Sequence, residues 1–167
     1  MMNAGASRGK LQVSTPSERE IAMTRVFNAP RRLVFDALTK PELVKQWLLG
    51  PPGWSMPVCE IDLRVGGAYR FVWRKEPSDK EVTMGIRGVF REIIAPERFV
   101  ATEKFDDPWY EGEAITTNQL VEERGKTTLT LTILYESREI RDGVLKTPMG
   151  EGVGASYDRL AALVEKP

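Results

Sequence analysis

The chain has 167 residues, of which 41% are hydrophobic and 29% are charged. This length fits one domain, because domains cluster near about 100–150 residues, and the composition is that of a globular protein with a core. Lysine plus arginine equal aspartate plus glutamate at 24 each. Because no net positive field attracts polyanions or anionic lipids, we expect neither nucleic acid nor a membrane as partner.

Histidine is absent from the sequence, and cysteine occurs once, at Cys59. The lack of histidine excludes Ser/His/Asp and Cys/His catalysis and removes the commonest metal ligand. A single cysteine forms neither an intrachain disulfide nor a cysteine zinc site. The glycine-rich motifs of nucleotide-binding loops are also missing. We therefore predict that the protein needs no metal and no cofactor.

The N-terminal segment consists mainly of small and polar residues. Residues 1–16 end at Pro16 and predict a flexible leader, followed by a single domain over residues 17–167. The segment lacks the apolar run of a signal peptide, and no window approaches the about 18 apolar residues of a membrane span. Together with the single cysteine, this pattern predicts a cytoplasmic protein.

The first half of the domain begins with a strand and two helices. Apolar residues with a loose period of two predict a strand from Glu20 to Phe27. Two short amphipathic helices then follow in tandem, opened by Pro30 and Pro41, since proline loses no hydrogen bond at the start of a helix.

A hairpin is expected next in the chain. Apolar and charged residues alternate on either side of Gly66-Gly67, which predicts a type I′ turn joining strands at about 58–65 and 68–75. Further strands are expected at 81–94, 98–105, 113–122 and 126–135.

The chain ends in the longest predicted helix. The helical period is carried by five apolar or aromatic residues: Val153, Tyr157, Leu160, Ala161 and Val164. Glycines at 150, 152 and 154 weaken such a helix, so they either permit a close approach to the sheet or leave open volume beside it. The order of elements predicts an α+β domain in which about seven antiparallel strands carry their helices on one face.

Several segments together resemble a known family. They are Arg25-x-Phe27-x-Ala29-Pro30, Trp47 followed by Gly50-Pro51, Asp62-Leu63-Arg64-Val65-Gly66-Gly67-Ala68-Tyr69-Arg70, Gly88-Val89-Phe90-Arg91-Glu92, and Tyr157-Asp158-Arg159-Leu160. In this combination the chain, from about residue 18 to 165, resembles the START-like (SRPBCC) superfamily. Within it, the chain is most similar to the branch of homologues of the activator of heat-shock-protein ATPase.

This resemblance implies both a fold and a class of function. The implied fold is the helix-grip, a curved antiparallel sheet wrapped around a long C-terminal helix and enclosing a cavity. The superfamily's shared property is the binding of hydrophobic small molecules such as lipids, polyketides and other aromatic compounds. Where the family usually has tryptophan at the start of the last helix, this chain has Val153, which implies extra space at one end of the cavity.

The predicted cavity has candidate wall and mouth residues. The expected wall combines aromatic and other apolar side chains from the sheet and the last helix: Tyr69, Phe71, Trp73, Met84, Ile86, Met149, Val153 and Tyr157. Trp47, Trp54 and Trp109 are expected near the mouth. The alternative is that these side chains simply form the core, because inward aromatic residues are typical of any half-buried sheet.

Glu103 is the candidate polar group of the site. It shares one strand face with Phe99, Ala101 and Phe105, but Val100 and Thr102 make the opposite face an equal candidate for the interior. A buried Glu103 would have a raised pKa and would act as an acid, a base or a hydrogen-bonding partner of a ligand.

Three functions remain open at this stage. The first is a binding module for a hydrophobic or aromatic small molecule, with no catalytic residue assigned. The second is an enzyme of the polyketide cyclase type, in which Glu103 or Tyr157 handles protons. The third is a chaperone partner that stimulates an ATPase, which the family name implies. We expect the adjacent aromatic pair Trp109-Tyr110 either to close the cavity or to form part of a homodimer interface.

Overall fold

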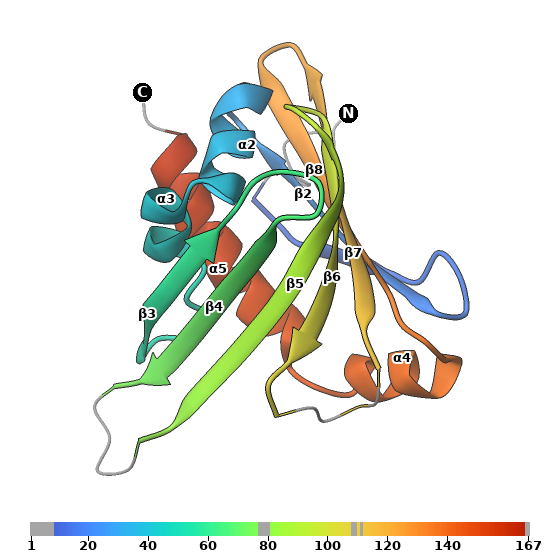
Figure 1. Cartoon of the computed structure of the whole chain (residues 1–167). Coiled ribbons are helices and arrows are strands. Elements are labelled where there is room, and N and C mark those ends of the chain that lie inside the picture. Colours follow the sequence, from blue (N-terminus) through green and yellow to red (C-terminus); the bar gives the residue numbers. More distant parts are fainter. Residues whose placement is uncertain (1–8, 77–80, 108–109, 111, 166–167) are drawn as a thin grey trace.

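The computed structural model describes residues 9–76, 81–107, 110 and 112–165. One antiparallel sheet curves around a long helix, and its strands follow the order β1-β2-β8-β7-β6-β5-β4-β3 (Figure 1). The strands are β1 (Gln12–Ser14), β2 (Glu20–Phe27), β3 (Trp54–Ile61), β4 (Ala68–Lys75), β5 (Thr83–Ile94), β6 (Arg98–Phe105), β7 (Ala114–Glu123) and β8 (Lys126–Leu134).

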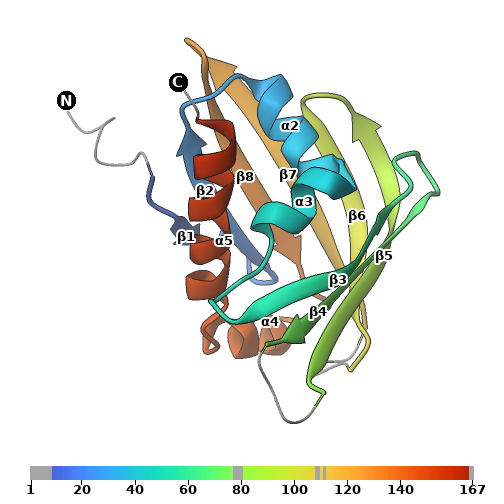
Figure 2. The ribbon, with the colours of Figure 1, turned by 90° about the vertical axis from the view of Figure 1, so that its left-hand side faces the viewer.

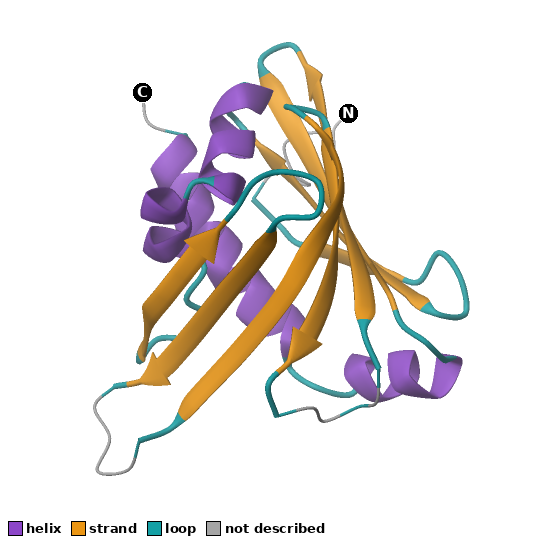
Figure 3. Ribbon diagram, in the orientation of Figure 1, coloured by secondary structure: helices purple, strands orange, loops and turns teal. Residues whose placement is uncertain are grey.

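The helices lie on one side of this sheet. They are α2 (Arg31–Thr39), α3 (Pro41–Trp47), α4 (Arg138–Leu145) and α5 (Met149–Val164). Helices α2, α3 and α5 cover the concave face, and α4 lies at one end of it (Figure 2). The convex face carries no helix among the described residues (Figure 3). The predicted α+β class and the helix-grip arrangement are therefore confirmed.

Aromatic contacts join the helices to the concave face. The ring of Tyr157 in α5 lies 5.8 Å from the ring of Phe27 in β2 and 5.9 Å from that of Trp47 in α3. Phe35 of α2 meets Phe99 of β6 edge to face at 5.8 Å. Because side chains alternate along a strand, these contacts fix which residues of each strand face the interior.

The core on this face consists of two clusters. The large cluster gathers around α2, α3 and the C-terminal half of α5, and it includes Phe27, Phe99 and Leu160. The small cluster combines residues of β2, β7, β8 and α4, together with Tyr135 just after β8: Ile21, Met23, Ala114, Ile133, Tyr135 and Val144. Val153 of α5 packs against both clusters.

Two elements have no counterpart among those expected from the sequence. Strand β1 lies inside the expected leader and pairs with β2 through Gln12–Ser14, so the leader prediction is wrong for these residues. Three exposed residues carry no periodicity, which is why the pattern gave no sign of the strand. Helix α4 was not expected either, although Ser137 caps it by accepting a hydrogen bond from the amide of Ile140 at 3.1 Å.

The turn between β3 and β4 also differs from its prediction. The hairpin exists, but β3 ends at Ile61 and a six-residue loop replaces the two-residue turn. Only Gly66 has a positive φ, of 86°, whereas Gly67 is needed for space because a Cβ there would lie 2.1 Å from the carbonyl oxygen of Asp62. Val65, the last residue of the strand expected at about 58–65, lies in this loop and is 62% exposed.

Candidate functional site

Glu103 points into the concave face. Pairing of β6 with its neighbours places Ala101 opposite Phe90 and Glu103 opposite Ala114, all on the face where Phe99 meets α2. This register decides between the two faces that the sequence left open. The residue is half-buried, and burial raises the pKa of its carboxyl group to about 7.

Three tyrosines interact electrostatically with this carboxyl group. Burial raises the pKa of Tyr69, Tyr110 and Tyr135, and the negative charge of Glu103 raises each of them further. The ring of Tyr110 stands edge to face with that of Tyr135 at 5.7 Å. The charge of Glu103 therefore acts on three phenol groups, which come from β4, from the segment after β6 and from the end of β8.

No cation compensates the charge of Glu103. Burial is the one cause of its pKa shift, and within the described part of the chain neither a nearby positive charge nor a hydrogen-bond donor lowers that pKa. Arg25, on the same face of β2, is 5% exposed and pairs with Asp158 of α5 at 2.6 Å. A carboxyl group in such surroundings is costly to ionise, which makes it a candidate for contact with a ligand.

The concave face stays partly accessible around Glu103. Four side chains of the concave face keep part of their surface open to water, and we call them the central band: Phe71, Glu103, Asn118 and Leu131. Asn118 faces inward because it lies opposite Phe99 on one side and Leu131 on the other. The two clusters thus do not close completely over the middle of the sheet.

Five of the expected wall and mouth residues are buried in the large cluster: Trp47, Tyr69, Trp73, Ile86 and Tyr157. The indole nitrogen of Trp47 donates to the carbonyl oxygen of Ala37 at 2.8 Å, and that of Trp73 donates to the carbonyl oxygen of Leu48 at 2.6 Å. Their polar atoms are already used by the backbone, so these two tryptophans act as packing anchors.

The other expected residues are more accessible. Trp54, Phe71 and Val153 are half-buried and pack against the large cluster. Met149 packs against the small cluster, and Met84, opposite Trp73 at the start of β5, is 44% exposed. Trp109 lies outside the described residues.

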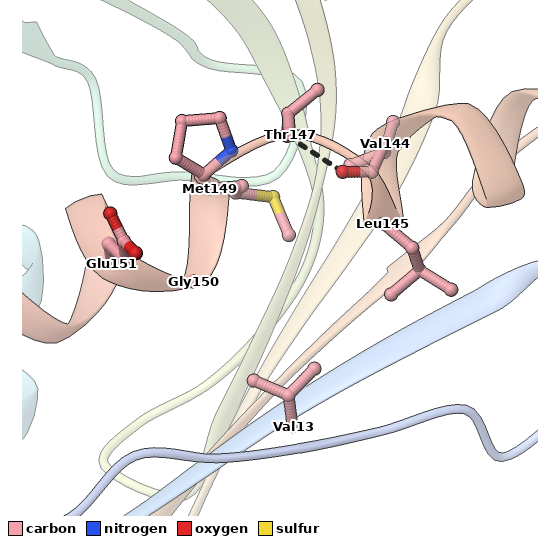
Figure 4. Close-up of a pocket in the computed structure, with 8 residues that line it drawn as sticks. Val13, Val144, Leu145, Thr147, Met149, Gly150 and Glu151 are labelled. Atoms are coloured by element: carbon pink, nitrogen blue, oxygen red, sulfur yellow. Dashed lines mark hydrogen bonds between the residues drawn. The ribbon is translucent and has the colours of Figure 1, made fainter.

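Two pockets lie at the ends of the grip. One, of about 220 Å³, is formed where β1 approaches the junction of α4 and α5, and Figure 4 shows Val13, Leu145 and Met149 pointing toward one another there. The other, of about 180 Å³, lies at the ends of β5 and β6, between Met84 and Phe105. Since Phe105 is two residues beyond Glu103 on one strand face, this second pocket adjoins the central band.

The glycines of α5 leave room rather than permit a close approach. A Cβ at Gly150 would come no nearer than 3.8 Å to Val13, and one at Gly152 would stay 3.8 Å from Pro51. At Gly154 nothing lies within 4 Å. None of the three glycines is therefore required by a close approach of α5 to the sheet.

Two of the segments that carry the family resemblance meet in space. The amide of Gly50 donates to the hydroxyl of Ser156 at 2.8 Å, and Arg159 donates to the carbonyl oxygen of Gly50 at 2.7 Å. Helix α5 thus holds the Gly50-Pro51 loop against its own side. These hydrogen bonds explain why the two segments occur together in one sequence.

The described residues hold no group of three or more Cys, Asp or Glu side chains placed to bind a metal. Among the helices that the structure describes, none is long and apolar enough to cross a membrane.

Comparison with known proteins identifies the family. Residues 28–165 match the family described as Activator of Hsp90 ATPase homolog 1-like protein. Because this match extends over most of the chain, the protein belongs to that family, whose START-like fold it shares. None of the curated proteins matches the sequence.

Solved structures of bacterial proteins share the fold. A protein from Rhodobacter sphaeroides is 28% identical, with a TM-score of 0.86 and coverage of 93% of this chain and 98% of its own. A protein from Chromobacterium violaceum is 30% identical, with a TM-score of 0.73 and coverage of 89% and 99%. A protein from Nitrosomonas europaea, 24% identical with a TM-score of 0.77 over 90% and 97%, supports the fold alone.

Proposed function

We propose that this protein binds a small apolar or aromatic molecule on the concave face of its sheet, with the polar group of that molecule against Glu103. The observation that carries the proposal is an inward carboxyl group without a counter-charge, set among aromatic side chains. Ligand sites commonly combine apolar walls with a few polar groups that fix orientation. The central band and the three tyrosines have this composition.

The size of the pockets limits the ligand. Their volumes of about 180 and 220 Å³ lie below the range of about 300–1,000 Å³ that is typical of sites for drug-sized ligands. A molecule of one or two rings fits this scale better than a long lipid. Val153 stands where the family usually has tryptophan, and this smaller side chain would leave room for such a ring beside α5.

The test is uptake of the neutral fluorescent probe N-phenyl-1-naphthylamine. We expect saturable fluorescence enhancement with the unchanged protein and its loss in Val153→Trp, because the indole fills the space beside the central band. Leu33→Trp is the matched control, since Leu33 is 49% exposed on α2 and the same indole there should leave uptake intact. Unchanged uptake in a folded Val153→Trp variant would reduce the site to ordinary core packing.

One observation favours a second function at the same place. A carboxyl group with a pKa of about 7 exchanges protons efficiently near neutral pH, which suits an enzyme of the polyketide cyclase type. Tyr157 suits this role less, because burial raises its pKa and its ring packs within the core. If the protein is such an enzyme, Glu103→Gln would abolish turnover while retaining binding.

The family name also suggests stimulation of a chaperone ATPase. An assay of ATPase activity with and without this protein tests that function directly.

A further inference from the structure

We propose that the natural ligand carries a basic nitrogen, which pairs as a cation with the Glu103 carboxylate while the apolar part of the ligand lies against the surrounding aromatic rings. This inference rests on the proposed function and names the chemical class of the ligand. It follows from the charges, the rings and the accessibility on the concave face.

Among the described residues around Glu103, each cation is either paired with another group or lies on the opposite face of the sheet. On β2, Arg25 is already paired with Asp158. Lys104 of β6 and Arg87 of β5 lie opposite each other on the convex face, and Arg87 binds Asp106 there at 2.7 Å. The titratable groups that act on the same region are the three tyrosines and the acidic Glu113. None of them supplies positive charge.

Helices α5 and α4 add no free cation either. Arg141, the buried arginine of α4, pairs with Asp142 at 2.9 Å and donates to the backbone carbonyl oxygen of Ser17 at 2.7 Å. The side chains that α5 turns toward the small cluster are Met149 and Val153, and α4 contributes Val144 and Ile140. Glu151, the acidic residue in the first turn of α5, is exposed and lines the same pocket as Met149. The described surroundings of Glu103 are therefore apolar, phenolic or acidic, and a ligand cation would be the missing partner.

The rings near Glu103 favour the same class of ligand. Tyr69 and Phe71 lie 5.1 Å apart, and Phe105 and Tyr110 lie 6.2 Å apart, so two ring pairs stand on the concave face beside the carboxyl group. Aromatic faces attract ammonium groups in addition to binding apolar surface. An anionic group would gain no such attraction from the ring faces and would be repelled by the carboxylate.

The pKa of Glu103 makes this pairing depend on pH. Near pH 7 about half of the empty sites are protonated, and only the ionised half pairs with a cation. An amine should therefore bind more tightly as the pH rises through 7, until the amine itself loses its proton. A neutral ligand that accepts a hydrogen bond from the protonated carboxyl group would show the opposite trend.

Three probes of one shape test the inference: 1-naphthylmethylamine, 1-naphthylmethanol and 1-naphthoate. At pH 8 we expect the amine to bind at least about tenfold more tightly than the alcohol, and the anion to bind most weakly. At pH 5.5 the preference for the amine should shrink to about twofold. Glu103→Gln should remove the preference at both pH values and change the affinity for the alcohol by no more than about twofold.

The control variant is Glu113→Gln, which removes a neighbouring carboxylate and should keep the preference. Equal binding of amine and alcohol, tighter binding of the anion, or a preference that survives Glu103→Gln would overturn the inference while leaving the binding function in place. If Glu103→Gln fails to fold, the pH trend of the unchanged protein decides. Failure of all three probes and of N-phenyl-1-naphthylamine would overturn the proposed function itself.

Discussion

The hydroxyl of Tyr69 in β4 donates a 2.7 Å hydrogen bond to the backbone carbonyl oxygen of Thr102 in β6, across the intervening strand β5. Gly88 of β5, opposite Tyr69, makes this crossing possible. A Cβ at Gly88 would lie 1.8 Å from that carbonyl oxygen and 2.5 Å from the Tyr69 ring. The glycine in the segment Gly88-Val89-Phe90 is thus required by close packing beside the central band.

Gly88→Ala should therefore destabilise the protein strongly. The new methyl group meets backbone on one side and a buried ring on the other, so we expect a loss of about 2–4 kcal/mol in the free energy of unfolding. Gly85→Ala, on the same strand, is the matched control: its Cβ would meet the Asp106 carboxylate, which is the movable end of a side chain. Urea unfolding that ranks the two variants equally would contradict this account of Gly88.

The ion pair between Arg25 and Asp158 supports a second prediction. Arg25 is 5% exposed and its guanidinium group lies 5.3 Å from the centre of the Phe27 ring, whereas Asp158 is 71% exposed. Asp158→Asn leaves a buried charge without its counter-ion and should cost about 1–3 kcal/mol. Arg25→Met combined with Asp158→Asn should cost less than the sum of the two single changes, as measured by a double-mutant cycle. Additive costs would mean that the pair does not interact.

Much of the fold follows from local patterns in the sequence. The period of two predicts β2 and β5 to β8, and Pro30 and Pro41 mark the starts of α2 and α3. The turn between the strands expected at 113–122 and 126–135 falls at Arg124-Gly125, with φ of 53° and 78°. These elements were predictable because each depends on its own residues and on one buried face.

The remaining features depend on contacts that are distant in the chain. Strand β1 exists only through its pairing with β2, and the inward direction of Glu103 is set by the register of β6 between β5 and β7. No local pattern indicates that Tyr135 belongs to the site, because this residue acts on Glu103 only once β7 and β8 have paired. A sequence pattern carries no register, so residues of this kind need the structure.

The glycines of α5 and of the β7–β8 turn predict opposite responses to alanine. Gly154 lies in a helix, and a Cβ added to it would have no other atom within 4 Å, so Gly154→Ala should raise the free energy of unfolding by about 0.5–1 kcal/mol. Gly125 is equally open but has a φ of 78°, so Gly125→Ala should lower it by about 1 kcal/mol. Thermal unfolding with the same sign for both variants would contradict the prediction.

The raised pKa of Glu103 predicts how stability depends on pH. The ordinary value is 4.5 and the folded value is about 7, so between these values the folded protein binds more protons than the unfolded chain. Below about pH 4.5 Glu103 therefore leaves the free energy of unfolding unchanged. As the pH rises toward 7 the free energy of unfolding falls, and above that pH the loss reaches up to about 3 kcal/mol.

Glu103→Gln removes this cost because the amide does not ionise. The variant should match the unchanged protein near pH 4 and be more stable by up to about 3 kcal/mol at pH 8, with the difference growing between pH 4.5 and 7. Glu123→Gln, an exposed change on β7, controls for the loss of one negative charge and should leave the pH profile in place. Urea unfolding from pH 4 to 8 measures all three proteins. A constant difference between Glu103→Gln and the unchanged protein would mean that Glu103 ionises freely, as it would on a hydrated surface.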